Sequence, residues 1–290
     1  MSAPPIVPPG ADPRNSAGPN PPDLTRYLAE PSAAEQHLAR LFGRQAPLVV
    51  LDIGACEGEE SIRYARAFPR ARIFAFEPLP ANQELIRVNL ARHSLEGRVE
   101  LVPLALADET GESTFHVSSG RPREEFSGPD WNYGNKSSSL LPPASASAMH
   151  GWIEFKESIT VRTDTLARFC ASRGLSRIDF VHLDVQGAEL RVLRGAGAHL
   201  ARVTALWLEV ADRELYRGQA LRGEIHRYLR SRGFALVAAA MHGVEGDAFY
   251  VNLRHPRAWR HLATHRARRG LAALRFRAGA LRASWRGTGP

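Results

Sequence analysis

Short apolar runs alternate with amphipathic segments along most of the chain. The first run, residues 46–53, is apolar almost throughout, which is typical of a strand buried on both faces of a sheet. Runs of this kind predict strands at 46–53, 71–78, 98–106, 177–185 and 203–210. The segments between them have helical character and predict helices at 59–68, 81–93, 163–174, 187–200 and 221–234.

This alternation predicts a parallel sheet. Strands joined by helices through short connections form right-handed crossovers, with the strands parallel and the helices on both faces. Two last apolar segments, 234–240 and 247–253, are joined by a glycine-containing turn whose length suits a hairpin. We therefore expect an α/β, Rossmann-like fold whose sheet ends in an antiparallel pair. A helix at 32–42, begun by the capping box of Ser32 and Glu35, is expected before the first strand.

Three segments do not fit the alternation. Residues 1–22 contain eight prolines and few large apolar residues, so we expect them to be disordered. One domain is expected over 23–253, interrupted at about 119–158 by an insertion rich in Gly, Pro, Ser and Ala. Insertions of this length are either lids over a binding site or plain surface excursions, and the aromatic residues in this one favour a lid. Residues 254–290 form an arginine-rich tail.

The basic charge of the chain is concentrated in this tail. The whole chain has 38 Lys and Arg against 30 Asp and Glu, which gives a net charge of +8. Ten of the arginines and none of the acids lie in residues 254–290, so the remainder has 28 basic against 30 acidic residues, or −2. The basic character therefore does not indicate a nucleic-acid-binding core.

The composition also bears on the cellular compartment. The chain has no uninterrupted apolar run long enough to span a membrane, and its first residues lack the basic segment and apolar core of a secretion signal. The only two cysteines, Cys56 and Cys170, do not indicate a disulfide framework. We therefore expect a cytoplasmic protein.

The turn after the first strand, GACEGEES, lies where sheets of this kind bind nucleotides, beyond the carboxyl ends of the strands. It lacks the lysine and hydroxyl of a phosphate-binding loop, and Gly54 and Gly58 do not have the spacing of a dinucleotide turn. Glu57, Glu59 and Glu60 would repel a pyrophosphate but not the sulfonium and ammonium groups of S-adenosylmethionine, whose one carboxylate can use the helix amino terminus. These glutamates favour S-adenosylmethionine over NAD.

Acidic residues at the ends of the strands also favour a nucleoside site. Glu77 ends the second strand, where a carboxylate can accept hydrogen bonds from both ribose hydroxyls, although NAD enzymes place an acid there as well. Asp108 follows the third strand and could accept a hydrogen bond from the adenine amino group, but Asp108 and Asp52 could instead be turn or cap residues. The predicted cofactor site comprises Asp52, Gly54, Ala55, Gly58, Ser61, Glu77, Pro78 and Asp108.

An ordered series of motifs resembles the FkbM family of S-adenosylmethionine-dependent methyltransferases. The motifs are VVLDIGACEGEES, FAFEP, the LALAD–G stretch, SSSL, and TDTLARF followed by IDFVHLDVQGAELRVLRGA, and the resemblance covers roughly residues 46–240. It implies a class I methyltransferase fold, with a seven-stranded, mostly parallel sheet whose last strand is antiparallel. It also implies O-methylation of a hydroxyl on a sugar, a glycolipid or polysaccharide, or another natural product. His182 and Gln186 stand where members often have lysine and glutamate, whereas Asp184 and Glu189 fit the pattern.

Methyl transfer to a hydroxyl requires removal of its proton while oxygen, methyl carbon and sulfur are held in line. His182 and Asp184 end the fourth strand two residues apart, so they point to the same face and could act as base and orienting carboxylate. Either could instead be a structural partner packed under the sheet. Candidate substrate contacts are Lys136, Ser138, Ser139, His150 and Gln186. The sequence shows no compact cluster of metal ligands, so no metal is predicted.

Apolar residues recur at near-helical spacing in the tail, with arginines between them. A basic amphipathic helix binds anionic membrane surfaces. It could also bind nucleic acid without specificity, or be a solvated extension. Peripheral contact with the inner face of a membrane is the preferred functional interpretation, since lipid-linked glycans would be suitable substrates.

Two other functions remain open from the sequence. An NAD-dependent oxidoreductase could use a similar sheet, although the glycine spacing and the glutamates of the turn disfavour it. A degenerate methyltransferase fold could also serve as a non-catalytic binding module. The presence of Glu77 and Asp184 disfavours that reading, and no specific nucleic acid partner is predicted.

Overall fold

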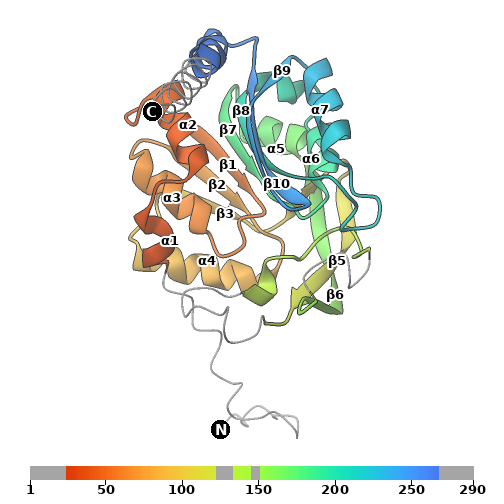
Figure 1. Cartoon of the computed structure of the whole chain (residues 1–290). Helices are drawn as coiled ribbons and strands as arrows, with labels where there is room; N and C mark the ends of the chain where they lie inside the picture. Colours follow the sequence, from red (N-terminus) through yellow and green to blue (C-terminus); the bar gives the residue numbers. More distant parts are fainter. Residues whose placement is uncertain (1–23, 122–132, 145–150, 268–290) are drawn as a thin grey trace, which may run out of the picture.

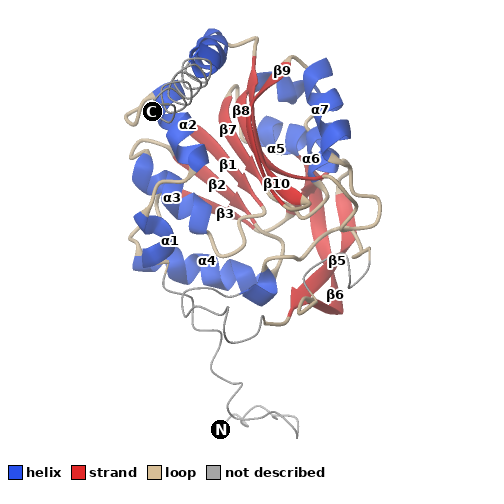
Figure 2. Ribbon diagram, in the orientation of Figure 1, coloured by secondary structure: helices blue, strands red, loops and turns tan. Residues whose placement is uncertain are grey.

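A seven-stranded sheet with helices on both faces and a smaller three-stranded sheet beside it make up the fold of the computed structural model (Figure 1, Figure 2). The structure describes residues 24–121, 133–144 and 151–267. The predicted disordered segment 1–22, much of the insertion and most of the tail therefore lie outside the described residues.

The large sheet has the predicted parallel core and an antiparallel hairpin at one edge. Its strands are β1 (Val49–Ile53), β2 (Arg72–Phe76), β3 (Val99–Val102), β7 (Ile178–Leu183), β8 (Val203–Ala211), β9 (Phe234–His242) and β10 (Glu245–Asn252). Their order is β3-β2-β1-β7-β8-β10-β9, in which the pairs from β3 to β8 are parallel and β10 runs antiparallel to both neighbours. The chain changes direction across the sheet at β1, so a ligand crevice is expected at the carboxyl ends of β1 and β7.

Helices cover the two faces of this sheet (Figure 1). One face carries α1 (Thr25–Ala29), α2 (Ala33–Phe42), α3 (Glu59–Ala67) and α4 (Pro80–Arg92). The other face carries α5 (Leu166–Ser172), α6 (Glu189–Gly195), the short 3-10 helix η4 (Gly197–Arg202) and α7 (Arg222–Ser231). Because side chains alternate along a strand, each buried strand contributes to both cores: on β2, Ile73 packs in one core and Phe74 in the other.

The predicted start of α2 is confirmed, although only half of the capping box forms. The hydroxyl of Ser32 accepts a hydrogen bond from the backbone N–H of Glu35 at 3.1 Å. The carboxylate of Glu35 accepts from Arg44 instead of returning to the backbone of Ser32.

Two predicted boundaries are wrong where the smaller sheet begins. This sheet has the order β4-β6-β5 and consists of β4 (Ala105–Ala107), β5 (Gly111–Ser119) and β6 (Glu154–Thr165). The apolar run 98–106 is therefore two strands, one in each sheet. The predicted helix 163–174 begins later, as α5, because Thr165 still pairs with Ala107 and its hydroxyl then caps the helix. An apolar run does not show that the chain moves from one sheet to the other within it.

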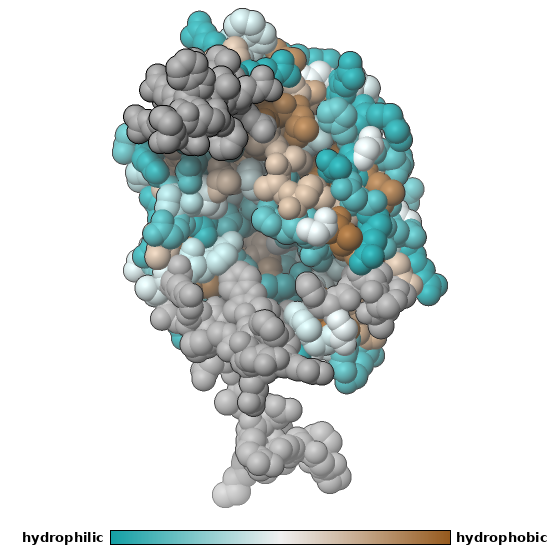
Figure 3. Space-filling model, in the orientation of Figure 1, coloured by the Kyte–Doolittle hydropathy of each residue, from teal (hydrophilic) through white to brown (hydrophobic). Residues whose placement is uncertain are grey.

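The end of the described chain packs beside α2. A helix at residues 256–267 follows β10, and its Ala258 and Leu262 join the same core as α2. Nε2 of His261 lies 3.1 Å from Nδ1 of His37 on α2. On the face shown in Figure 3 the described surface is mostly hydrophilic. Within the described residues, no helix combines the length and hydropathy needed to cross a membrane.

Candidate active site

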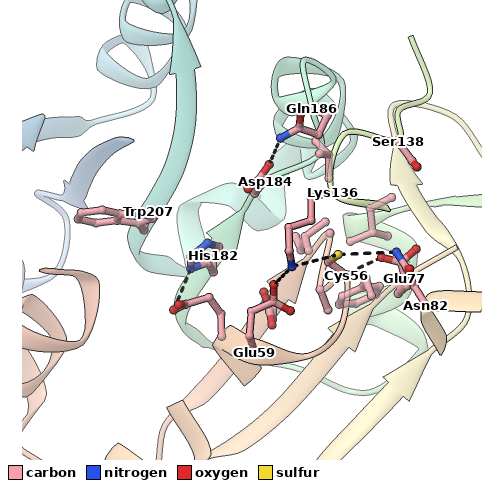
Figure 4. A pocket seen from close by; sticks show the side chains of 18 of the residues that line it. Cys56, Glu59, Glu77, Asn82, Lys136, Ser138, His182, Asp184, Gln186 and Trp207 are labelled. Atoms are coloured by element: carbon pink, nitrogen blue, oxygen red, sulfur yellow. Dashed lines mark hydrogen bonds and ion pairs between the residues drawn. The ribbon is translucent and has the colours of Figure 1, made fainter. Parts of the chain in front are cut away.

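A cavity of about 430 Å³ opens at the carboxyl ends of β1, β2, β7 and β8. Open parallel sheets bind ligands at this edge, and the volume lies in the range of small-molecule sites, roughly 300–1,000 Å³. The strand order sets the order of the lining side chains: Glu77 follows β2, Asp52 is on β1, His182 is on β7 and Trp207 is on β8. Figure 4 shows Glu77 and Trp207 at opposite sides, with His182 between them.

The turn after β1 is fixed between its two neighbouring strands. Gly54 has φ +86°, and a Cβ there would lie 1.7 Å from the carbonyl oxygen of Asp184, so only glycine fits. The backbone N–H groups of Gly54 and Ala55 donate to the carbonyl oxygen of Phe76 at 3.0 and 2.9 Å. The turn consequently forms a rigid wall of the cavity.

Glu77 is held in place by backbone donors. Its Oε2 accepts from the N–H of Cys56 at 2.9 Å, and its Oε1 accepts from the N–H of Leu79 at 2.8 Å. Burial raises the pKa of Glu77 to about 8, against the lowering effect of these two hydrogen bonds. A hydrogen bond from the side chain of Asn82 is a third one to this carboxylate, which leaves it at least one free acceptor position. The residue lines the cavity with Pro78 and the apolar residues 104–106. This end of the cavity is suited to a ribose and an adenine.

Two glutamates of the turn attach the insertion to it. Oε1 of Glu57 accepts from Nδ2 of Asn135 at 2.8 Å, and Oε1 of Glu59 accepts from Nζ of Lys136 at 2.5 Å. Because Lys136 neutralises Glu59, the turn repels a pyrophosphate less than its sequence suggested. These two glutamates therefore position a second segment of the chain.

One described part of the insertion, residues 133–144, lies at the cavity. Lys136 and Ser138 line it, and Oγ of Ser139 donates to the carbonyl oxygen of Gln186 at 2.7 Å. The hydroxyl of Tyr216 donates to the carbonyl oxygen of Ser137 at 2.7 Å. These contacts attach residues 133–144 to the segment after β7 and to the loop after β8.

His182 and Asp184 both line the cavity but bind different partners. Nδ1 of His182 lies 2.7 Å from the hydroxyl of Tyr64, whereas Oδ1 of Asp184 accepts from Nε2 of Gln186 at 2.8 Å. Gln186 has a left-handed backbone (φ +53°), and its amide engages the Asp184 carboxylate. Asp184 is therefore not the hydrogen-bonded orienting carboxylate that the sequence led us to expect.

Three carboxylates that are distant in the chain meet at Asp184. Asp184, Glu189 and Glu209 each place an oxygen within 4.8 Å of the other two. Nε2 of Gln186 donates to Asp184 and also to Glu209, at 3.0 Å, while Oε1 of Glu189 accepts from two backbone N–H groups. Burial raises the pKa of Asp184, and burial together with the charge of Asp184 raises that of Glu209. The sequence shows no compact ligand cluster of the kind seen in zinc sites, but folding brings these three oxygen ligands together, because β7, α6 and β8 converge here.

Most of the predicted site residues line this one cavity. They are Asp52, Gly54, Ala55, Glu77, Pro78, Lys136, Ser138, His182, Asp184 and Gln186.

The other predicted residues lie elsewhere. Ser61 is buried behind the turn, where its hydroxyl donates to Asp52 at 2.6 Å, and Gly58 begins α3. Ser139 is buried, and His150 lies outside the described residues. Asp108 follows β4 and accepts from Nε of Arg191 at 2.7 Å, away from the cavity lining. The structure therefore gives no support to the adenine contact predicted for Asp108.

Several lining residues were missed from the sequence: Tyr27, Asn82, Asn135, Trp207, His242 and Asp247. Trp207 could have been found, because it lies within a predicted strand next to the one that carries His182, with which it pairs in register. Asn82 and Asn135 carry no such signal, since they meet through the docking of the insertion, at 2.8 Å between Nδ2 of Asn135 and Oδ1 of Asn82.

These features define a class of protein. They are those of the class I S-adenosylmethionine-dependent methyltransferases. The features are the strand order, the position of β10 antiparallel beside the edge strand, and a cavity lined by the turn after β1 and by an acid after β2. The chain belongs to the FkbM family within this class, since the family described as Methyltransferase FkbM domain matches residues 52–236.

Curated relatives agree with this assignment. The chain is 34% identical over 206 residues to the 2-O-methyltransferase NoeI of Sinorhizobium fredii (strain NBRC 101917 / NGR234), covering 71% of this chain and 80% of NoeI. It is 28% identical over 203 residues to the 31-O-demethyl-FK506 methyltransferase FkbM of Streptomyces tacrolimicus, covering 66% of this chain and 74% of that protein. A solved structure of M. capricolum TrmK with S-adenosyl-homocysteine matches at a TM-score of 0.41 and 9% identity, over 76% of this chain and 68% of that chain, which does not bear on function.

The protein is therefore an S-adenosylmethionine-dependent O-methyltransferase. The NAD-dependent oxidoreductase and the non-catalytic module considered from the sequence are set aside.

Proposed function

We propose that this enzyme methylates a hydroxyl of a sugar, either free or within a glycolipid, a polysaccharide or a glycosylated natural product. The supporting observation is Trp207, which lines the end of the cavity opposite Glu77 (Figure 4). Its Nε1 donates to Oδ1 of Asp247 at 3.1 Å, which fixes the indole, and Asp184 and His242 line the same cavity. A sugar ring has apolar faces that pack on an aromatic ring and hydroxyls that donate to carboxylates.

The other end of the cavity fits S-adenosylmethionine. The Glu77 carboxylate is oriented by two backbone donors and has a free acceptor position left for a ribose hydroxyl. Gly54 keeps the turn free of a side chain where the wall is closest to β7. When bound, S-adenosylmethionine supplies a methyl group on a sulfonium centre. A single cavity from Glu77 to Trp207 gives the cofactor and the acceptor adjoining places.

His182 and Asp184 lie between these two ends. We assign His182 the removal of the proton from the acceptor hydroxyl, since an imidazole is a common general base and His182 is the one that β7 contributes to the cavity lining. Asp184 can accept a hydrogen bond from the acceptor and orient it, because only one of its oxygens is engaged by Gln186.

The proposal is tested with the purified enzyme, S-adenosylmethionine and a panel of sugars, glycolipids and non-sugar alcohols. Release of S-adenosyl-homocysteine is measured, and the methylated product is identified by mass spectrometry. We expect turnover with sugar acceptors and a KM for them that rises about tenfold in Trp207→Phe and more in Trp207→Ala, with cofactor affinity unchanged. Trp259→Ala is the matched control, since that indole is 59% exposed on the last helix. Turnover confined to non-sugar alcohols would overturn the proposal.

We also propose that the enzyme acts in the cytoplasm, in peripheral contact with the inner face of a membrane. The ten arginines of residues 254–290 support this, as does the class of acceptor proposed above.

A further inference from the structure

The carboxylate of Glu60 is engaged through one oxygen and left without a hydrogen bond on the other. Its Oε1 accepts from the hydroxyl of Tyr27 at 2.6 Å and from Nε of Arg63 at 2.9 Å. Its Oε2 is buried and accepts no hydrogen bond within the described residues. A buried carboxylate oxygen without a donor is costly, so its position calls for an explanation. This oxygen lies 3.9 Å from Nδ1 of His182.

Tyr64 lies in the same place. It is fully buried on α3, and its hydroxyl is 2.7 Å from Nδ1 of His182. Burial, followed by the charge of Glu60, raises the pKa of Tyr64 well above its ordinary value. The phenol therefore keeps its proton at all physiological pH values, and that proton has two directions in which it can be donated.

The two directions have opposite consequences for catalysis. If Tyr64 donates to Nδ1 of His182, neutral His182 carries its proton on Nε2 and cannot act as a base through that atom. If Tyr64 donates toward Glu60, the phenol oxygen accepts from Nδ1–H, and Nε2 is free to take a proton.

The charge of Glu60 decides between the two directions. Burial alone would raise the pKa of Glu60, but the charges of His182 and Arg63 and the hydrogen bonds from Tyr27 and Arg63 outweigh it, so the pKa is lowered. Arg63 and the two hydrogen bonds also act when His182 is neutral, and they favour the ionised carboxylate. A negative charge beside the phenol attracts its proton and favours Nδ1–H on the histidine. Since Nδ1 is engaged with Tyr64 and His182 lines the cavity, Nε2 is the ring nitrogen left for a ligand.

We propose that Tyr64 and Glu60 position His182 as the general base. This rests on the proposed function, in which the acceptor is a hydroxyl. In this arrangement Oε2 of Glu60, which accepts no hydrogen bond within the described residues, takes a hydrogen bond from the Tyr64 hydroxyl. The Tyr64 oxygen accepts from Nδ1–H, and Nε2 of His182 takes the proton of the acceptor hydroxyl. As the proton leaves, the acceptor oxygen forms its bond to the methyl carbon. The carbon–sulfur bond breaks, and its electron pair stays on sulfur, which becomes a neutral thioether. The resulting imidazolium is balanced by Glu60.

Other charged groups also face His182. Asp52 on β1 pairs with it in register, and Asp184 and Asp247 act on it from β7 and β10. Glu60 differs from them because its charge acts on the Tyr64 hydroxyl, which contacts Nδ1, and it can therefore set the tautomer. Tyr64 and Glu60 are thus positioning residues, which act through the histidine.

Kinetics provide the first test. In Tyr64→Phe and Glu60→Gln we expect kcat to fall roughly tenfold to a hundredfold, with KM for the acceptor and affinity for S-adenosylmethionine changed less than about threefold. His182→Asn should lose at least as much. Glu60→Gln should also change the pH profile of kcat, because it removes a charge beside the Tyr64–His182 contact. Tyr250→Phe is the matched control, a core tyrosine away from the cavity that is 1% exposed.

Nitrogen NMR of labelled histidine provides the second test, which needs no acceptor. The signal of His182 is the one that is lost in His182→Asn. In the wild type it should show a protonated Nδ1 and an unprotonated Nε2, and it should change in Tyr64→Phe. If NMR shows this tautomer but no sugar is methylated in the acceptor screen, the proposed acceptor is wrong and the positioning role of Tyr64 and Glu60 is retained. The Nε2–H tautomer, or unaltered kcat and pH profile in folded Tyr64→Phe and Glu60→Gln, would overturn the positioning role.

Discussion

At the scale of single residues, the main feature of the site is a set of buried carboxyl groups with raised pKa values. Burial raises the pKa of Asp52 to about 6, that of Glu189 to about 7 and that of Glu77 to about 8. Each of these groups also accepts hydrogen bonds that work against this rise. The ligand-free site thus holds protons over a range of pH in which exposed carboxyls have lost theirs.

Stability should therefore fall as the pH rises. The pKa of Glu77 is about 8 in the folded chain against an ordinary 4.5, so between these values the folded state binds more protons than the unfolded state. Each pH unit in this window then costs up to about 1.4 kcal/mol for this group. Urea unfolding of the ligand-free enzyme from pH 5 to 8 measures the slope, which should be smaller in Glu77→Gln. Glu84→Gln, at a glutamate whose side chain is 68% exposed, is the control. Identical slopes in wild type and Glu77→Gln would show that Glu77 is ionised throughout.

At the scale of elements, the order of strands and helices could be predicted from the sequence, because each buried strand is an apolar run bounded by helical periodicity. The transfer of β4 to the smaller sheet could not, since Ala105–Ala107 continues the apolar pattern of β3. In the site, Asp52, Glu77 and Asp184 could be placed because strand ends define their positions. The contacts of Asn135 and Lys136 could not, because they depend on how the insertion docks.

The docking of the insertion should control cofactor binding. Lys136 of the insertion pairs with Glu59 of the cofactor turn, with both side chains largely buried. In Lys136→Met the carboxylate of Glu59 loses its partner, and we expect the affinity for S-adenosylmethionine to fall roughly tenfold, mainly through faster dissociation. Calorimetry and stopped-flow fluorescence measure these quantities. Lys156→Met removes a lysine that pairs with Glu154 while 74% exposed, and should leave binding unchanged. Equal affinity of Lys136→Met and wild type would show that this ion pair does not couple the insertion to the cofactor.

Convergence of β7, α6 and β8 raises the question of a metal ion. Asp184, Glu189 and Glu209 are the kind of oxygen donors that Mg²⁺ binds. However, the side-chain N–H groups of Gln186 donate to Asp184 and to Glu209. The positive end of this amide dipole therefore stabilises the two carboxylates in the place that a cation would take. We therefore expect the methyltransferase rate to be unchanged after chelation with EDTA and after addition of Mg²⁺. Loss of activity on chelation, restored by a divalent ion, would contradict this and would mean that Gln186 moves when substrate binds.

At the scale of the whole molecule, charge separates the tail from the catalytic domain. Residues 254–290 carry all of the excess positive charge, and the remainder carries −2. The described start of the tail is a helix whose Arg257, Arg260 and Arg266 are exposed. The tail can thus attract the enzyme to an anionic surface. The cavity is a separate feature, at the carboxyl ends of the strands.

Vesicle sedimentation with the full chain tests this attraction. We expect binding to phosphatidylserine-containing vesicles, little binding to phosphatidylcholine vesicles, and release at high salt, because the Debye length falls from about 10 Å at 0.1 M to about 3 Å at 1 M. Each basic residue near the surface contributes about 1 kcal/mol, so replacing three tail arginines by glutamine should weaken binding roughly a hundredfold. The tail variant replaces Arg257, Arg260 and Arg266, and the control of equal charge replaces Arg87, Arg168 and Arg177, which are exposed on the domain. Equal weakening by both variants would mean that net charge alone draws the protein to the surface. Binding to phosphatidylcholine vesicles as strong as to the anionic ones would instead show that the arginines are not the cause of membrane contact.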